Sequence, residues 1–403
     1  MPVTAPRPVR VAVIGWGNFF GHIHEQTLAD LIGEGRCELR AVCVRSESTR
    51  AEIAARLPVG YGTADASRVC ADPEIDAVLI GAPQAVQARY AIDALAAGKY
   101  VYVEKPLFCD EGDTGTAPEA FGRAFAALGA AGTDRLAVGL NKRFAPAYVA
   151  LRRRCREEWG GARHLQFNVI DDAWRWGAKY PDGFLLWLDL CHWLDAVRWF
   201  TGAEVARLSC LEPQANDAQV TLALTDGGVA SILLSGNGSM DMVKEELRVI
   251  TAGRRSATVR DFVEVEIFGG PRIEVLSYPA NRQTGGDRSY CTRIDQGGLP
   301  AFRAIRREVF DRFQASRSAD PQGDAGVRRN IPNFMRPQGW NESLRELVAA
   351  AAGGRPVRGA AGWRDAYIGY RLLDICRASI AAGGQFVDAS SALGAHRSAV
   401  QEP

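Results

Sequence analysis

The chain has 403 residues, too many for one ordinary core, so we expect two domains. Its formal net charge of +1 gives no electrostatic attraction to nucleic acid or to an anionic membrane. The amino-terminal segment lacks the apolar stretch of a signal peptide, and no run approaches the ~20 apolar residues of a membrane span. We therefore expect a cytoplasmic protein without nucleic-acid or membrane partners. The nine cysteines have no metal-ligand spacing, which predicts reduced thiols and no metal site.

The first 140 residues alternate between strand and helix patterns. Strands are predicted at 9–15, 38–44, 76–82, 100–104 and 135–141, with helices at 24–33, 47–57 and 85–98. Strands that alternate with helices form parallel βαβ units. We therefore predict a dinucleotide-binding Rossmann domain of the α/β class over residues 1–140.

The pattern changes after about residue 160. A helix is predicted at 184–202, followed by alternating apolar and polar runs at 219–236, 245–253 and 262–277, and by helices at 341–354 and 363–384. Alternation with Gly and Asp-Gly turns is typical of an antiparallel sheet with one covered face. Residues 280–298 and 315–337, rich in Gly, Pro, Arg and Asp, are predicted to be surface loops. We predict an α+β domain with a large, mostly antiparallel open sheet over residues 141–390, and a flexible tail at 391–403.

A glycine-rich turn follows the first predicted strand. In dinucleotide-binding domains the first glycine permits a tight turn, the second lets the backbone approach a pyrophosphate, and the third packs the helix on the sheet. Here the third glycine, Gly21, comes one residue late, and Phe20 takes its usual position. The predicted cofactor-binding residues of the turn are Gly15, Gly17, Asn18, Phe19 and Phe20. The alternative is a glycine-rich turn that binds nothing.

The end of the second strand indicates which dinucleotide binds. An acid there holds the ribose 2′-hydroxyl of NAD, whereas a basic or small polar residue accommodates the 2′-phosphate of NADP. Val44 stands in place of the acid, and Arg45 and Ser46 follow it. A guanidinium can grip a phosphate with two hydrogen bonds, and a hydroxyl can donate another. NADP(H) is therefore favoured over NAD(H), with Glu47 nearby as the opposing observation and a solvent-facing Arg45 as the alternative.

Residues 76–106 carry the most specific pattern. They resemble the Gfo/Idh/MocA oxidoreductases, in which a strand, a proline turn, a helix, a Gly-Lys pair and a Glu-Lys-Pro segment follow one another. The matching residues are Pro83, Gly98, Lys99, Val101, Glu104, Lys105 and Pro106. Gln87 replaces the family's histidine after the first proline. Residues 141–146, 188–202 and 340–366 also resemble family segments, so the similarity covers most of the chain.

The Glu-Lys-Pro segment ends a strand at the carboxyl edge of the parallel sheet, where ligands bind in such folds. The resemblance implies that Lys105 lies between nicotinamide and substrate and donates to the reacting oxygen, where a cation stabilises alkoxide character. In the family the proline bond is often cis. We also assign Ala82, Pro83 and Glu104 to the cofactor site. A solvated loop lysine is the alternative.

The helix predicted at 184–202 resembles the family helix with a catalytic histidine. The histidine matches His192, and the acid after it matches Asp195, for which we expect a structural role. The family's aspartate four residues before the histidine is Leu188 here, and the acid is displaced to Asp189. Because helix positions three and four apart are neighbours, Asp189 is expected to flank His192 and to orient it or the substrate. An imidazole, with a reference pKa of about 6.5, suits proton exchange; a core histidine is the alternative.

Three further residues are candidates for substrate binding. Tyr180 could donate the proton in place of His192, as a tyrosine does in some family members. Arg143 could meet a substrate anion or brace the domain junction. Trp174 lies on a predicted loop whose aromatic and basic residues would suit a sugar nucleotide, or would only cap a sheet edge.

These features predict an NADP(H)-dependent oxidoreductase that interconverts a secondary alcohol and a ketone on a sugar, nucleotide sugar or cyclitol. The prediction requires Lys105 and His192 to converge beside the nicotinamide. The alternatives are an imine or C=C reductase of the same fold and a non-catalytic dinucleotide-sensing regulator; the presence of both Lys105 and His192 argues against them. A one-sided sheet would expose apolar surface, so we expect a homodimer or homotetramer through the second domain's sheet.

Overall fold

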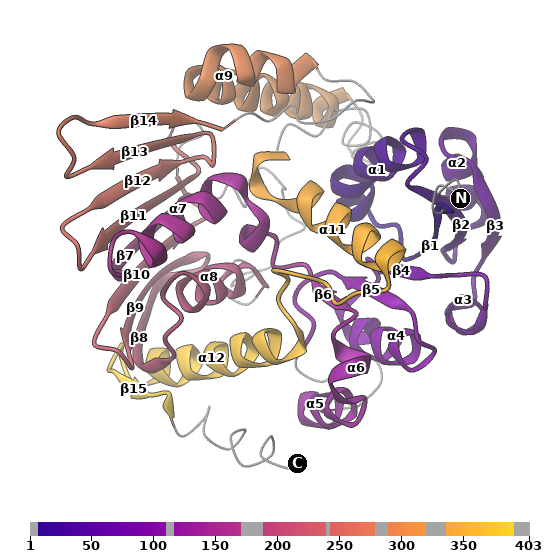
Figure 1. Ribbon diagram of the computed structural model, residues 1–403, viewed down its shortest axis with the longest axis horizontal. Coiled ribbons are helices and arrows are strands. Elements are labelled where there is room, and N and C mark those ends of the chain that lie inside the picture. Colours follow the sequence, from indigo (N-terminus) through magenta and orange to yellow (C-terminus); the bar gives the residue numbers. More distant parts are fainter. Residues whose placement is uncertain are drawn as a thin grey trace, which may run out of the picture. The chain divides into compact units, whose positions relative to one another are not determined.

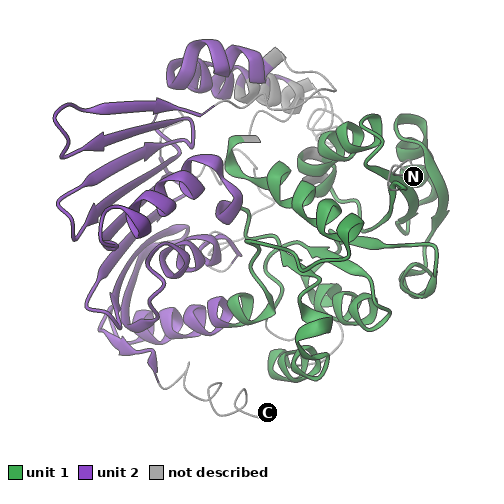
Figure 2. Ribbon diagram, viewed as in Figure 1, with its two compact units in different colours: residues 1–141, 282–288, 319–367 green, residues 142–281, 289–318, 368–403 purple. Residues whose placement is uncertain are grey.

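The computed structural model describes residues 7–109, 117–170, 188–238, 242–278, 289–319 and 336–390. The chain forms two compact units, coloured green and purple in Figure 2. Unit 1 comprises residues 1–141, 282–288 and 319–367, and unit 2 comprises residues 142–281, 289–318 and 368–403. None of the helices among the described residues combines the length and apolar character that a membrane span requires.

Unit 1 is built on a six-stranded sheet in the order β3-β2-β1-β4-β5-β6 (Figure 1). Its strands are β1 (Val9–Ile14), β2 (Cys37–Cys43), β3 (Val59–Thr63), β4 (Ala77–Ile80), β5 (Tyr100–Val103) and β6 (Leu136–Val138). All neighbouring strands are parallel, and the order is that of the doubly wound Rossmann sheet. The helices are α1 (Asn18–Gly33), α2 (Glu47–Arg56), α3 (Ala66–Ala71), α4 (Gln84–Ala96), α5 (Pro118–Ala127), α6 (Gly129–Thr133), η4 (Arg336–Gln338) and α11 (Trp340–Gly353). The predicted Rossmann fold of the α/β class is confirmed.

Helix α11 lies far from the other elements of unit 1 in the sequence, yet it belongs to this unit (Figures 1 and 2). Leu344, Leu347 and Val348 are buried in the same core as the strands β1 and β5. Arg345 forms a two-pronged ion pair with Glu34 at the end of α1, at 2.7 and 2.8 Å. The division of the chain therefore differs from the linear boundary predicted at residue 140, because the apolar face of this helix completes the core of the Rossmann sheet.

Unit 2 contains a nine-stranded sheet in the order β14-β13-β12-β11-β7-β10-β9-β8-β15. Its strands are β7 (Ala162–Ile170), β8 (Val205–Gln214), β9 (Asp217–Leu224), β10 (Val229–Ser235), β11 (Glu245–Thr251), β12 (Ser256–Arg260), β13 (Glu264–Phe268), β14 (Glu274–Ser277) and β15 (Val387–Asp388). Among the strands of the described residues only β7 and β10 pair in parallel, so the predicted mostly antiparallel sheet is confirmed.

The helices described around this sheet are η1 (Asn141–Phe144), α7 (Pro146–Glu157), α8 (Cys191–Thr201), α9 (Ser289–Ala319) and α12 (Trp363–Ala381). Apolar residues of α7, α8 and α12 share one core with the buried face of the strands. Along β10, buried and more exposed residues alternate, with Val229 and Leu233 on the exposed side. The sheet is therefore covered on one face, as the alternation predicts.

One strand of the structure was not predicted, and one local prediction differs from it. The segment Val59–Thr63 forms strand β3, although its two glycines hide the apolar alternation. Residues 289–298, predicted to lie in a loop, form the first part of α9, which breaks at Gly298, where φ is +59°. The predicted tail at 391–403 lies outside the described residues.

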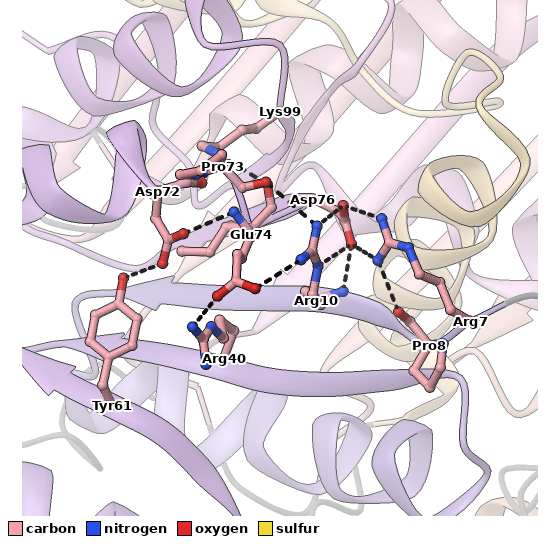
Figure 3. A network of polar contacts seen from close by, with 11 residues as sticks. Arg7, Pro8, Arg10, Arg40, Tyr61, Asp72, Pro73, Glu74, Asp76 and Lys99 are labelled. Atoms are coloured by element: carbon pink, nitrogen blue, oxygen red, sulfur yellow. Dashed lines mark hydrogen bonds and ion pairs between the residues drawn. The ribbon is translucent and has the colours of Figure 1, made fainter.

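A network of charged side chains ties β1 to β4 at the amino-terminal edge of the Rossmann sheet (Figure 3). The Asp76 carboxylate accepts hydrogen bonds from Arg7 at 2.7 and 2.9 Å and from the Arg10 backbone at 2.9 Å. Glu74 joins Arg10, 3.7 Å away, to Arg40 on β2. Because the strands run parallel, this network lies at the edge opposite to their carboxyl ends, which indicates a structural role.

All nine cysteines are free thiols. Burial raises the pKa of Cys37 and of Cys155 to about 12, which keeps these thiols protonated and unreactive at neutral pH. The prediction of reduced thiols agrees with this arrangement.

Candidate functional site

The carboxyl ends of β1, β4 and β5 lie side by side in unit 1. Ile14 pairs with Ile80, and Ile80 pairs with Val103. The residues that follow these strands are therefore neighbours, and hydrogen bonds of 2.9 Å connect them, from Gly81 N to Ile14 O and from Glu104 N to Ile80 O. This edge brings the glycine-rich turn next to the Glu-Lys-Pro segment.

The glycine-rich turn fits a dinucleotide phosphate. Gly15 has φ +82°, and a Cβ added to it would lie 2.5 Å from Ala82 N, so only glycine is tolerated. A Cβ on Gly17 would meet no atom within 4 Å, so the backbone beside it is open to approach. Helix α1 begins at Asn18 without a side-chain cap, and the amides of its first turn have no acceptor within the helix. Such amides bind phosphate groups.

The extra residue in the turn, Phe20, packs inside unit 1. Its side chain is only 2% exposed, and its ring lies 2.5 Å from where a Gly81 Cβ would be. A Cβ on Gly21 would lie 2.8 Å from the Trp16 indole nitrogen. The third glycine thus gives space to Trp16, and Phe20 can contribute to a cofactor site through its backbone amide.

The turn after β4 is held by a glutamine. Gln87 is buried and donates from Nε2 to the Ala82 carbonyl at 2.9 Å. Ala82 and Pro83 thereby keep a fixed backbone next to Gly15. The residue that replaces the family's histidine therefore supports the turn itself.

The turn between β2 and α2 contains Arg45 and Ser46, and Arg50 follows near the start of α2. Ser46 caps α2, since its Oγ accepts from Thr49 N at 3.2 Å. Arg45 is exposed. Arg50, which the sequence analysis did not single out, places its guanidinium against the end of β2 and donates from Nη1 to the carbonyls of Val44 and Arg45 at 2.5 and 3.1 Å. Its position near the start of a helix capped by Ser46 is the sequence feature that could have identified Arg50 as a candidate.

The Glu-Lys-Pro segment follows β5, and its Lys105–Pro106 peptide bond is cis. Lys105 is half-buried, whereas Glu104 is 5% exposed. The Glu104 Oε1 atom lies 2.6 Å from His24 Nε2 on α1 and accepts from the Tyr102 hydroxyl at 3.1 Å. Burial, together with the Glu104 charge, raises the pKa of Tyr102 well above its ordinary value, so the tyrosine remains a donor.

Lys99, the other lysine of the matched pattern, has a structural environment. It is 4% exposed and donates from Nζ to the carbonyls of Asp72 and Ile75 at 2.6 and 3.0 Å (Figure 3). Lys99 therefore supports the loop before β4 at the edge away from the glycine turn.

In unit 2, helix α8 carries His192, which is 6% exposed, and Asp195, which is 2% exposed. Asp189 is half-buried in a π-helical turn just before the helix. Arg143 on η1 forms a two-pronged ion pair with Asp195, from Nε at 2.8 Å and from Nη2 at 2.6 Å. This ion pair connects η1 to α8 at Asp195, about one turn after His192. Tyr180 and Trp174 lie outside the described residues.

A second cation of η1 is buried beside the same helix. Lys142 donates from Nζ to Glu245 Oε2 at 2.5 Å and lies over the rings of Trp193 and Phe262, 4.8 and 4.9 Å from their centres. Tyr148 donates to the other Glu245 oxygen at 2.7 Å. Burial lowers the pKa of Lys142, against the opposing charge of Glu245. Lys142 and Glu245 are 103 positions apart in the chain, and no sequence pattern connects them.

The model of an oxidoreductase family with an NAD-binding Rossmann fold matches residues 9–120. Inositol 2-dehydrogenase 2 of Saccharopolyspora erythraea is 25% identical over 383 residues, covering 93% of this chain and 94% of the relative. Two solved structures show the same fold. One is apo scyllo-inositol dehydrogenase from Lactobacillus casei, with a TM-score of 0.66 and 15% identity; the alignment covers 96% of this chain and 100% of that one. The other is levoglucosan dehydrogenase in complex with NADH and levoglucosan, with a TM-score of 0.65 and 18% identity; the alignment covers 95% of this chain and 99% of that one. The family match includes the glycine turn and the Glu-Lys-Pro segment, and the inositol dehydrogenase aligns along nearly the whole chain, so both comparisons support the resemblance to the Gfo/Idh/MocA oxidoreductases.

Proposed function

We propose that the protein is an NADP(H)-dependent oxidoreductase that interconverts a secondary alcohol and a ketone on a sugar, nucleotide sugar or cyclitol. The observation that carries this proposal is the single edge of unit 1 that holds both the glycine turn of Gly15 and the segment of Lys105. The substrate class is supported by the names of the relatives, which are dehydrogenases of inositols and of levoglucosan.

The roles of the residues follow from their chemistry. When bound, the nicotinamide supplies hydride chemistry. The Lys105 ammonium donates a hydrogen bond to the reacting oxygen and stabilises negative charge on it. His192 exchanges the hydroxyl proton, with Asp189 orienting it, and Tyr180 is the alternative donor.

Two further residues complete the proposed substrate site. Trp174 would stack on a sugar ring. Arg143 is the weaker candidate for a substrate anion, because two of its guanidinium nitrogens already bind Asp195.

The catalytic proposal is tested with Lys105→Ala and Lys105→Arg. We expect Lys105→Ala to bind NADPH with a Kd within about threefold of the parent and to lose about 10³-fold in kcat, because one preorganised donor contributes about that much. Lys105→Arg should retain more turnover because it keeps a cation. Turnover of Lys105→Ala within tenfold of the parent on a panel of inositols and sugars would remove Lys105 from the mechanism.

The proton donor is tested by comparing His192→Asn with Tyr180→Phe. If His192 exchanges the proton, His192→Asn should lower kcat by about 10²- to 10⁴-fold and remove one ionisation from the pH profile. Tyr180→Phe should then retain kcat within about fivefold. The reverse pattern would assign the role to Tyr180.

The preference for NADP(H) is supported by the turn after β2. It offers the Arg45 and Arg50 guanidinium groups and the Ser46 hydroxyl, and Val44 replaces the acid that would bind a ribose hydroxyl. The structurally similar levoglucosan dehydrogenase holds NADH, so the preference of this chain must come from its own residues at this turn. A higher kcat/KM with NADH than with NADPH would overturn this part of the proposal.

We further propose that the exposed face of the unit 2 sheet binds a second copy of the chain. Leu211, Val229, Leu233, Ile250 and Val275 lie on its strands with 38–57% of their surface exposed. A row of apolar side chains on an open face favours self-association. Light scattering should give the mass of a dimer or tetramer, and Leu233→Glu should shift it toward the monomer; a monomeric parent would refute the proposal.

A further inference from the structure

A buried polar cluster lies beneath the Glu-Lys-Pro segment of unit 1. Glu104 and His24 are 5% and 0% exposed, and their side chains are 2.6 Å apart at Oε1 and Nε2. Tyr102 donates to the same oxygen at 3.1 Å. The His24 ring lies between those of Phe20 and Tyr102, with centres 4.8 and 5.1 Å away.

The cluster connects the two functional segments of this sheet edge. His24 is on α1, the helix that begins at the glycine turn, and Glu104 is the residue before Lys105. Within the described part of the chain Glu104 is the hydrogen-bond partner of the His24 ring, and Nδ1 of that ring has none. A Cβ on Gly139 would lie 3.0 Å from the second carboxylate oxygen of Glu104, so the carboxylate is also confined from the side of β6.

We propose that His24 is a positioning residue for Lys105. Glu104 continues the pairing of β5 with β4, since its N–H donates to the Ile80 carbonyl at 2.9 Å, and Lys105 follows it directly in a bend. By holding the Glu104 carboxylate inside the unit, His24 fixes the direction in which Lys105 leaves the strand end. The inference rests on the proposed function, since it gives His24 no role apart from Lys105.

The variants are chosen to separate this hydrogen bond from packing. His24→Phe keeps an aromatic ring against Phe20 and Tyr102 but cannot bind Glu104. His24→Gln places an amide nitrogen close to the position of Nε2 and retains the bond. Tyr102→Phe is the matched control, because it removes the other donor to the same oxygen and leaves His24 in place.

We expect His24→Phe to lower kcat by about 10- to 100-fold, since a displacement of about 1 Å in a reacting group has that effect. KM for NADPH should stay within about threefold, because the glycine turn is untouched, and His24→Gln should recover most of kcat. Tyr102→Phe should remain within about threefold of the parent. If His24→Phe does not fold, His24→Asn makes the same test, because its amide is too short to reach Glu104.

The decisive measurement is a double-mutant cycle with Lys105→Ala. If His24 acts through Lys105, adding His24→Phe to Lys105→Ala should not lower the residual turnover further. Equal losses in both backgrounds would show a general structural effect and overturn the inference, as would a His24→Phe enzyme within twofold of the parent. Turnover of Lys105→Ala within tenfold of the parent would remove Lys105 from the mechanism, and no turnover of the parent on the whole substrate panel would refute the proposed function, so these failures are distinguishable from a failure of the His24 inference alone.

Discussion

Arg50→Ala is the sharpest test of how the turn after β2 selects the cofactor. Arg50 donates from Nη1 to two backbone carbonyls, at 2.5 and 3.1 Å, which holds the guanidinium at the carboxyl end of β2. Within the described residues no carboxylate forms an ion pair with it, so Nε and Nη2 are available for a phosphate. One charge-assisted hydrogen bond contributes about 1.5–3 kcal/mol, equivalent to about 10- to 150-fold in affinity.

The assay measures kcat/KM with NADPH and with NADH for the parent, Arg50→Ala and Arg45→Ala. With Arg50→Ala we expect kcat/KM for NADPH to fall by about 10- to 150-fold and that for NADH to change by less than about threefold, because NADH has no 2′-phosphate. Arg45→Ala should have a smaller effect of the same kind, since the side chain is exposed and screened by solvent.

The alternative is that Arg50 only braces the β2–α2 turn through its two carbonyl bonds. In that case both cofactors should lose affinity by the same factor. An equal loss for NADPH and NADH would refute the role in selectivity while leaving the Rossmann site intact. Thermal unfolding without cofactor is the control, because it measures how much Arg50 stabilises the β2–α2 turn itself.

Three further predictions concern stability and binding. Gly15→Ala should lower Tm and weaken NADPH binding, because Gly15 has φ +82° and its added Cβ would lie 2.5 Å from the Ala82 backbone nitrogen. Gly17→Ala should leave Tm unchanged, because its Cβ would meet no atom within 4 Å. Equal losses of Tm for the two variants in a thermal scan would contradict this prediction. Lys142→Met should destabilise the protein by about 3–5 kcal/mol in urea unfolding, because Glu245 would remain buried without its cation, and adding Glu245→Leu should recover most of that loss. Asp76→Asn should lower the free energy of unfolding at pH 7 by roughly 1 kcal/mol, since the ion pairs are partly exposed. Although burial alone would raise the pKa of Asp76, hydrogen bonds from the adjacent arginines lower it, so its contribution is present above the unfolded pKa of about 3.9 and is lost as pH falls below it. A difference between parent and Asp76→Asn that does not shrink from pH 5 to pH 3 would refute the assignment.

The fold of the Rossmann unit was predictable because residues close together in the sequence determine it. Each apolar strand is followed by a helix, and the motif residues Gly15 and Lys105 stand directly after strands. Parallel strands have their carboxyl ends on one edge, so the two motifs had to be close together once the sheet was inferred. The cis bond at Lys105–Pro106 has no sequence signal beyond the family resemblance.

The supporting contacts of the site were not predictable. His24 and Glu104 are 80 positions apart, and the helical pattern of residues 24–33 says only that His24 starts a helix, not which side chain it meets. Lys142 was part of a matched segment, but its burial over Trp193 depends on the register of unit 2. Hydrophobic periodicity reports which face of an element is buried, and it carries no information about the partner on the other side.

The position of α11 has a consequence for biosynthesis. Leu344 and its neighbours complete the core beneath β1 and β5, yet the ribosome produces them only after the strands β7 to β14. A nascent chain that ends before residue 340 leaves apolar surface of the Rossmann sheet uncovered, and transiently exposed apolar surface of this kind favours aggregation. The core of the dinucleotide-binding unit can therefore close only after residues 340–353 have been synthesised, although its strands precede those of unit 2 in the chain.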